Sequence, residues 1–147
     1  MRTVTRLPNS LRIVTDEMNE LDTVALGAWV GIGSMFEPAE INGISHLLEH
    51  MVFKGTTTRS ARQIAEEIEN VGGYFNACTS RETTSFYIKV LKEDLPLAVD
   101  ILADILLHST FAPDEFDREK AVVLQEINQS VDTPDDIIFD YFQETAF

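Results

Sequence analysis

A short segment in the first half of the chain holds three ionisable side chains at a spacing that suits metal chemistry. His46 and His50 are four positions apart, and Glu49 lies three positions after His46. On a helix these positions share one side, so both imidazoles can bind one metal ion and the carboxylate can take a proton from metal-activated water. Zinc suits this arrangement because it polarises a carbonyl and lowers the pKa of water to about 7. The order is that of the His-Glu-x-x-His motif read backwards.

The alternative for this segment is a solvated helix face with incidental histidines. Its apolar neighbours argue against that alternative, because they predict a largely buried helix in which ionisable groups need a reason. These neighbours are Leu47, Leu48, Met51, Val52 and Phe53.

A catalytic zinc usually takes three protein ligands, so another ligand must come from elsewhere in the chain. Glu126 is a candidate, since Val122 and Val123 place it on an apolar helix face where a carboxylate is costly without a cation. Glu119 lies two turns earlier on the same face and could support the same site. On these grounds alone, an ordinary salt-bridged helix acid explains Glu126 better than a metal ligand does. His108 is a weaker candidate, because near the end of an apolar helix it would interact with the helix C-terminus.

The elements around these residues predict an α+β domain. Strands are expected at 2–7, 11–17, 23–34, 74–79 and 83–91, and helices at 43–54, 60–70, from Asp94, at 113–131 and from Pro134 onward. Ser60 and Gln63 form a capping box that begins the second helix. The order of the elements indicates an antiparallel sheet with helices packed on one side.

The composition narrows the function further. The chain has 147 residues and a formal net charge of −14, which disfavours nucleic acid. The excess acid either attracts a basic peptide or only keeps the protein in solution, and the sequence favours neither explanation. No apolar run approaches the ~18 residues that a membrane helix needs, and the N-terminus lacks the apolar core of a secretory signal. The single cysteine, Cys78, permits no internal disulfide and is expected to be a small buried residue.

Three parts of the sequence resemble the pitrilysin/insulinase family of metallopeptidases, most closely its processing-peptidase branch. They are the segment 43–56 around the two histidines, the segment 72–82, and Glu126, which lies 76 positions after His50. The resemblance implies Zn²⁺ ligands at His46, His50 and Glu126, a catalytic base at Glu49 and a supporting acid at Glu119. It also implies that Phe53 lines the substrate pocket and that Asn76 and Ala77 lie on an edge strand that binds the peptide backbone by strand addition.

The family resemblance also implies a larger protein. Residues 1–147 would be the N-terminal part of a metallopeptidase domain, and this part alone would be a poor enzyme. The intact protein would be a zinc-dependent endopeptidase for peptides or presequence-like segments, located in a bacterial cytoplasm, or in the mitochondrial matrix if a targeting segment has been removed. Its partners would be a peptide, with a basic one favoured by the charge, and further domains or a second subunit. The main alternative is a non-catalytic partner subunit of the same fold. An iron or redox protein fits less well. There is only one cysteine, and although a His/His/Glu set could hold Fe(II), the resemblance to the peptidases outweighs that possibility.

Overall fold

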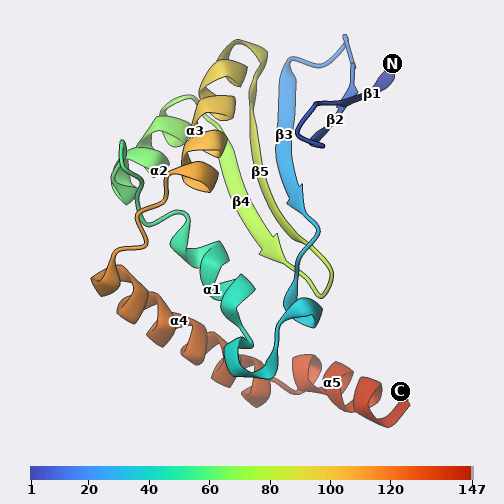
Figure 1. Cartoon of the computed structure of the whole chain (residues 1–147), viewed down its shortest axis with the longest axis vertical. Helices are drawn as coiled ribbons and strands as arrows, with labels where there is room; N and C mark the ends of the chain where they lie inside the picture. The colour runs from blue at the N-terminus through green and yellow to red at the C-terminus, as the bar shows by residue number, and fades with distance from the viewer. Residues whose placement is uncertain (147) are drawn as a thin grey trace.

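The computed structural model describes residues 1–146 and has an α+β fold, as the sequence predicts (Figure 1). A two-stranded hairpin begins the chain. It is followed by a three-stranded antiparallel sheet and five α-helices, with two of the helices lying between the first and second sheet strands in sequence. The hairpin strands are β1 (Arg2–Arg6) and β2 (Arg12–Asp16), and the sheet strands are β3 (Thr23–Val30), β4 (Tyr74–Thr79) and β5 (Thr84–Leu91). The helices are α1 (Ile44–Met51), α2 (Ala61–Asn70), α3 (Leu95–Leu107), α4 (Pro113–Asp132) and α5 (Pro134–Ala146).

The core lies between the sheet and the helices on one of its faces (Figure 1). The strand order is β3-β5-β4, and the central strand β5 alternates between buried and more exposed residues, as a sheet with one covered face requires. Phe86, Ile88 and Val90 form its buried side. They belong to the same core as Ile68 of α2 and Ile101 of α3, each at most 1% exposed. The prediction of helices on one side of an antiparallel sheet is therefore confirmed.

Two predicted elements are shorter in the structure by four residues each, and the ends of most others differ by one or two residues. The strand predicted at 23–34 ends at Val30, which is paired with the first residue of β5, Thr84, so no partner strand continues beyond it. The chain then passes closely over the β4–β5 turn, where a Cβ atom on Gly33 would lie 2.3 Å from the Ser80 carbonyl oxygen. The helix predicted at 43–54 ends at Met51. Gly55, at φ 126°, has a left-handed backbone conformation that interrupts any helical continuation.

Two further expectations about burial are corrected. Cys78 is exposed, because its side chain lies on the face of the sheet opposite to the one that the helices cover. The hairpin of β1 and β2 forms as predicted, but all ten of its strand residues are exposed and it belongs to a separate sheet. No helix within residues 1–146 combines the length and the apolar character that crossing a bilayer demands.

The arrangement of α1 and α4 positions the residues of interest. Helix α1 contacts β4, which is an edge strand of the sheet, and α4 runs beside α1 (Figure 1). The segments that leave α1 and enter α4 are joined by backbone hydrogen bonds. Thr110 donates its N–H to the Gly55 carbonyl oxygen at 3.1 Å, and Thr57 donates to the His108 carbonyl oxygen at 3.0 Å. We refer to this pairing of residues 55–57 with 108–110 as the α1–α4 clamp.

Candidate metal centre

The start of α1 is fixed by an acidic side chain from the preceding loop. Glu37 accepts the backbone N–H of Gly43 at 2.6 Å with one carboxylate oxygen and that of Ser45 at 2.7 Å with the other. These amides lie at the first turn of the helix, where backbone donors lack internal partners. Burial raises the pKa of Glu37, but hydrogen bonds from the Ser45 side chain and the two amides outweigh it and lower the pKa below its ordinary value. Glu37 thus anchors the turn that carries His46.

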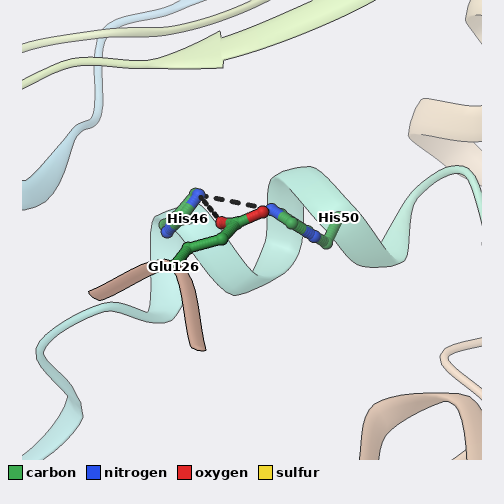
Figure 2. A group of neighbouring side chains, drawn as sticks. All are labelled: His46, His50 and Glu126. Atoms are coloured by element: carbon green, nitrogen blue, oxygen red, sulfur yellow. Dashed lines mark hydrogen bonds and ion pairs between the residues drawn. The ribbon is translucent and has the colours of Figure 1, made fainter. Parts of the chain in front are cut away.

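Three potential ligand atoms converge between α1 and α4 (Figure 2). The Nε2 atoms of His46 and His50 lie 3.2 Å apart. The Oε2 atom of Glu126 lies 3.4 Å from the first and 3.5 Å from the second. The structure therefore brings together residues that are 76 positions apart in the chain.

This triangle matches the size of a tetrahedral zinc site. Zinc binds nitrogen and oxygen ligands at about 2.0–2.1 Å, and tetrahedral geometry then separates the ligand atoms by about 3.3 Å. The three separations of 3.2–3.5 Å agree with that value. Two imidazole nitrogens and one carboxylate oxygen are also a donor set that catalytic zinc sites use. The residues present therefore fit a zinc ion with one position left for water or substrate.

Glu119 supports His50 from the side opposite the ligand triangle. Its Oε2 atom lies 3.0 Å from Nδ1 of His50, and its Oε1 atom lies 2.6 Å from Nζ of Lys54. Burial raises the pKa of Glu119, but the hydrogen bonds and charges of Lys54 and His50 outweigh it and lower the pKa. An ionised carboxylate can only accept, so Nδ1 of His50 donates in this contact, and in the neutral ring Nε2 then has its lone pair toward the triangle.

The burial of the two acids differs from the sequence-based expectation. The side chain of Glu126 is 45% exposed, so the argument that it lies on a buried apolar face was wrong. Glu119 is the buried acid, at 8% side-chain exposure. On α4 only Glu119 and Val123 are buried. Helix α1 contacts α4, and Glu126, one turn after Val123, lies at the exposed edge of this contact. The expectation of a largely buried α1 was also too strong, since Leu48 is exposed.

A small cavity of about 220 Å³ adjoins His50, and several of the other predicted site residues also line it. Its lining consists of Glu49, His50, Phe53, Lys54, Asn76, Ala77 and Glu119. The Phe53 ring packs on Phe75 at a centroid distance of 5.0 Å, which ties the cavity wall to β4. Within residues 1–146, Oε2 of Glu49 is a buried side-chain oxygen that lacks a hydrogen-bond partner. A buried carboxylate oxygen of this kind is costly unless a ligand or reactant satisfies it.

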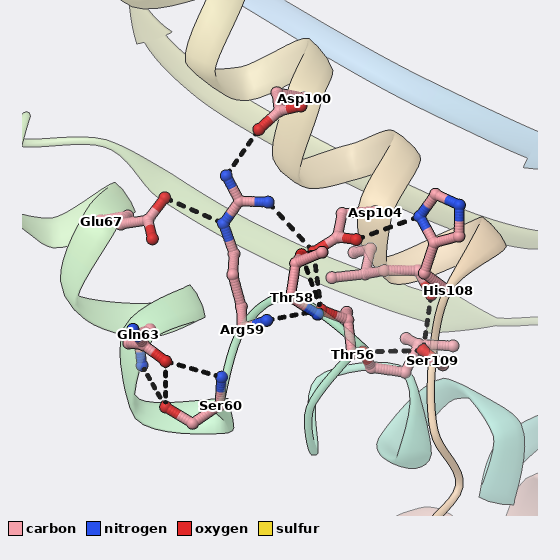
Figure 3. Close-up of polar contacts among 12 residues, drawn as sticks. Thr56, Thr58, Arg59, Ser60, Gln63, Glu67, Asp100, Asp104, His108 and Ser109 are labelled. Atoms are coloured by element: carbon pink, nitrogen blue, oxygen red, sulfur yellow. Dashed lines mark hydrogen bonds and ion pairs between the residues drawn. The ribbon is translucent and has the colours of Figure 1, made fainter.

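A larger cavity, of about 450 Å³, adjoins a network of charged and polar groups around Asp104 (Figure 3). Oδ2 of Asp104 accepts hydrogen bonds from Thr56 at 2.7 Å, Thr58 at 2.8 Å and Arg59 at 3.0 Å. Burial lowers the pKa of Arg59, but its hydrogen bonds to Asp100, Asp104 and Glu67 outweigh it and raise that pKa. These groups satisfy one another, so the network is structural. It fixes the loop that forms one half of the α1–α4 clamp.

His108 belongs to this network. Its Nδ1 atom lies 3.1 Å from Oδ1 of Asp104, and it caps the C-terminal end of α3. It is not among the converging residues of the metal centre within 1–146. The preference for a helix-end role over a ligand role agrees with this placement.

Two residues near the site escaped the sequence analysis. Lys54 follows His50 by four positions, a spacing that places both on one side of a helix, and this signal could have been noticed. Glu37 gave no such signal. Its partners are backbone amides six and eight positions away across an irregular loop, and no residue pattern encodes that contact.

Comparison with known proteins identifies the family of this chain. The model of the insulinase family (peptidase family M16) matches residues 12–147. The chain is 50% identical over 139 residues to YmxG of Bacillus subtilis, named an uncharacterized zinc protease, covering 95% of this chain and 34% of that protein. It is 45% identical over 144 residues to a probable mitochondrial-processing peptidase subunit beta of Arabidopsis thaliana, covering 98% of this chain and 27% of that protein.

A solved structure shows the same fold. A protease from Helicobacter pylori superposes with a TM-score of 0.89 at 26% sequence identity, covering 95% of this chain and 34% of that one. The chain spans about a third of the length of these relatives. The match of the family model across nearly the whole sequence decides the family. The chain belongs to the insulinase family of peptidases, peptidase family M16.

Proposed function

We propose that this chain carries the zinc site and catalytic base of a zinc-dependent endopeptidase, and forms the N-terminal part of a longer metallopeptidase. The observation that carries the proposal is the triangle of His46, His50 and Glu126, with separations of 3.2–3.5 Å, beside a buried Glu49 oxygen that lacks a partner. These three residues would be the zinc ligands. The names of the bacterial relatives, which call them zinc proteases, support the same metal.

Glu49 would move the proton during peptide hydrolysis. When bound, zinc would polarise the scissile carbonyl and lower the pKa of the attacking water to about 7. Glu49 takes one proton from the water as the oxygen adds to the carbonyl carbon. It then delivers that proton to the leaving nitrogen as the carbon–nitrogen bond breaks. Glu119 contributes by holding the His50 ring in the tautomer that leaves Nε2 free.

The substrate would bind as an added strand along β4. This strand pairs with β5 on one side and forms an edge of its sheet, and an extended peptide can bind such an edge through its backbone. Asn76 and Ala77 of β4 and Phe53 line the cavity next to His50, which supports their proposed contact with substrate. The charge of −14 favours a basic peptide.

The rest of the active enzyme would come from outside this chain. Because the chain spans about a third of its relatives, we propose that residues 1–147 alone are inactive and need further domains or a second subunit. We propose a bacterial cytoplasmic location, or the mitochondrial matrix, since one relative is named as a mitochondrial protein.

Replacing Glu49 by Gln in the protein that carries this chain tests the catalytic role. The amide keeps the shape of the carboxylate but cannot accept the proton, so kcat should fall by about 10²–10⁴-fold while bound zinc is unchanged. Glu69→Gln, at an exposed position of α2, is the matched control and should leave both values unchanged. Stoichiometric zinc with no cleavage by the unaltered protein would favour the alternative, a non-catalytic subunit of the same fold.

A further inference from the structure

We propose that Lys54 is a positioning residue of the metal centre: its ammonium group holds Glu119 in place as the hydrogen-bond partner of His50. This inference rests on the proposed function, because it concerns how the same zinc site is kept in order. Lys54 follows the end of α1 and is not one of the converging ligands.

The contact between Lys54 and Glu119 is close and shielded. Nζ of Lys54 lies 2.6 Å from Oε1 of Glu119, and the two side chains are 32% and 8% exposed. An ion pair in this environment is much less screened than one on the open surface. Removing the cation would leave the Glu119 charge buried with one oxygen unpaired, which is a costly state.

The two oxygens of Glu119 are assigned to two different partners. Oε2 faces Nδ1 of His50 at 3.0 Å, while Oε1 faces Lys54. Because both oxygens are held, the carboxylate cannot rotate without losing a charged hydrogen bond. Without Lys54, only the contact with His50 would orient it. The His50 ring would then lose the fixed partner that aligns its Nε2 atom with His46 and Glu126.

Charge balance gives the same conclusion. Three carboxylates lie at or beside the site, namely Glu49, Glu119 and Glu126. A zinc ion supplies two positive charges, and Lys54 supplies the third. With Lys54 in place, Glu119 is neutralised locally and remains a supporting acid. In its absence the negative charge of Glu119 would lose its neighbouring cation, and only His50 would remain to hold the carboxylate.

The test uses Lys54→Met and Lys54→Arg in the protein that carries this chain, with Lys92→Met as a matched control. Nζ of Lys92 lies 3.8 Å from a carboxylate oxygen of the exposed Asp22, so Lys92→Met removes the same charge at another place in the protein. Two quantities are measured: zinc affinity by competition with a chelator, and the visible absorption spectrum of the cobalt-substituted protein, which reports the arrangement of the ligands around the metal. Lys54→Met should weaken zinc binding by about 10–100-fold and change the cobalt spectrum. Lys54→Arg should restore both, because its guanidinium can also donate to Glu119.

The outcomes separate this inference from the proposed function. If Lys54→Met lowers thermal stability but leaves zinc affinity and the cobalt spectrum as in the unaltered protein, Lys54 is only a structural residue and the inference is overturned. Lys54→Gln serves if the Met variant does not fold. If the folded, unaltered protein binds no zinc, the proposed function fails and this inference fails with it. Loss of zinc in His46→Ala combined with normal zinc in Lys54→Met would reject the Lys54 role alone.

Discussion

The amide nitrogen of Thr110 and the carbonyl oxygen of Gly55 are joined by a 3.1 Å hydrogen bond. This contact connects the segment that leaves α1 to the segment that enters α4. The two helices carry different halves of the metal centre, so the geometry of the site depends on how this clamp sets them against each other. The Asp104 network fixes the same loop through Thr56 and Thr58.

Replacing Glu126 by Gln should abolish tight zinc binding. The amide oxygen is neutral and is a much weaker zinc ligand than a carboxylate, so affinity should fall by at least about 100-fold. Because Glu126 is 45% exposed, the free energy of unfolding of the metal-free protein should change by less than about 0.5 kcal/mol. Equilibrium dialysis and chemical denaturation measure the two quantities. Asp117→Asn, at an exposed position of the same helix, is the control, and equal zinc affinity in both variants would refute the ligand role.

Replacing Glu37 by Gln should destabilise the start of α1 by about 1 kcal/mol at neutral pH, since the two backbone amides lose a charged acceptor. The folded-state pKa of Glu37 is lowered. Its contribution to stability is therefore present above the unfolded-state pKa and is lost as pH falls through the folded-state value. Unfolding curves at pH 7 and at about pH 4 and below should show the difference between variant and unaltered protein shrinking with acid. A difference that is independent of pH would contradict this account.

Replacing Asp104 by Asn should cost about 3 kcal/mol of stability, because it removes the charge from a buried carboxylate that pairs with Arg59. Burial raises the pKa of Asp104, but hydrogen bonds from Thr56, Thr58, Arg59 and His108 outweigh it and lower the pKa to about 2. This stabilisation should be complete above about pH 4 and lost as the pH falls through about 2. Asp100→Asn is the matched control, since Asp100 pairs with the same arginine but its side chain is 64% exposed. Thermal unfolding should therefore show a lower melting temperature for Asp104→Asn than for Asp100→Asn, and equal melting temperatures would contradict this prediction.

On the proposed function, cleavage of basic peptides should depend on salt. The net charge of −14 attracts a cationic peptide at low ionic strength, and salt screens that attraction. Raising the ionic strength from about 0.01 M to about 1 M should therefore increase KM for a basic peptide while changing KM little for its neutral counterpart. Steady-state kinetics on matched peptides measure this. A KM that is equally insensitive to salt for both peptides would show that the acidic surface plays no part in binding.

Much of the fold could be predicted from residue patterns. The alternation of Phe86, Ile88 and Val90 defined the central strand, and the Ser60–Gln63 capping box defined the beginning of α2, which the structure confirms. Element ends were less predictable. Where β3 ends depends on Thr84, the first residue of a partner strand more than fifty positions later, and such pairing leaves no local mark.

The site was predictable to the extent that it was local. His46, Glu49 and His50 lie within one and a half turns of helix, so their spacing alone made them candidates. The contribution of Glu126 needed the resemblance to a family, because its exposed position gives no energetic signal of its own. Burial was the weakest inference, because Val122 and Val123 lie three or four positions from both Glu119 and Glu126. Only the crossing of α1 over α4 decides which of the two is covered.

The wide separation of the ligands in sequence also has a consequence for biosynthesis. His46 and His50 are synthesised early, but Glu126 emerges from the ribosome only when most of these 147 residues have been made. Closing so long a loop costs chain entropy that α1 and α4 must first recover by packing together. On the proposed function, a nascent chain can therefore offer zinc only two imidazoles until α4 docks on α1. The complete zinc site would form only after that step.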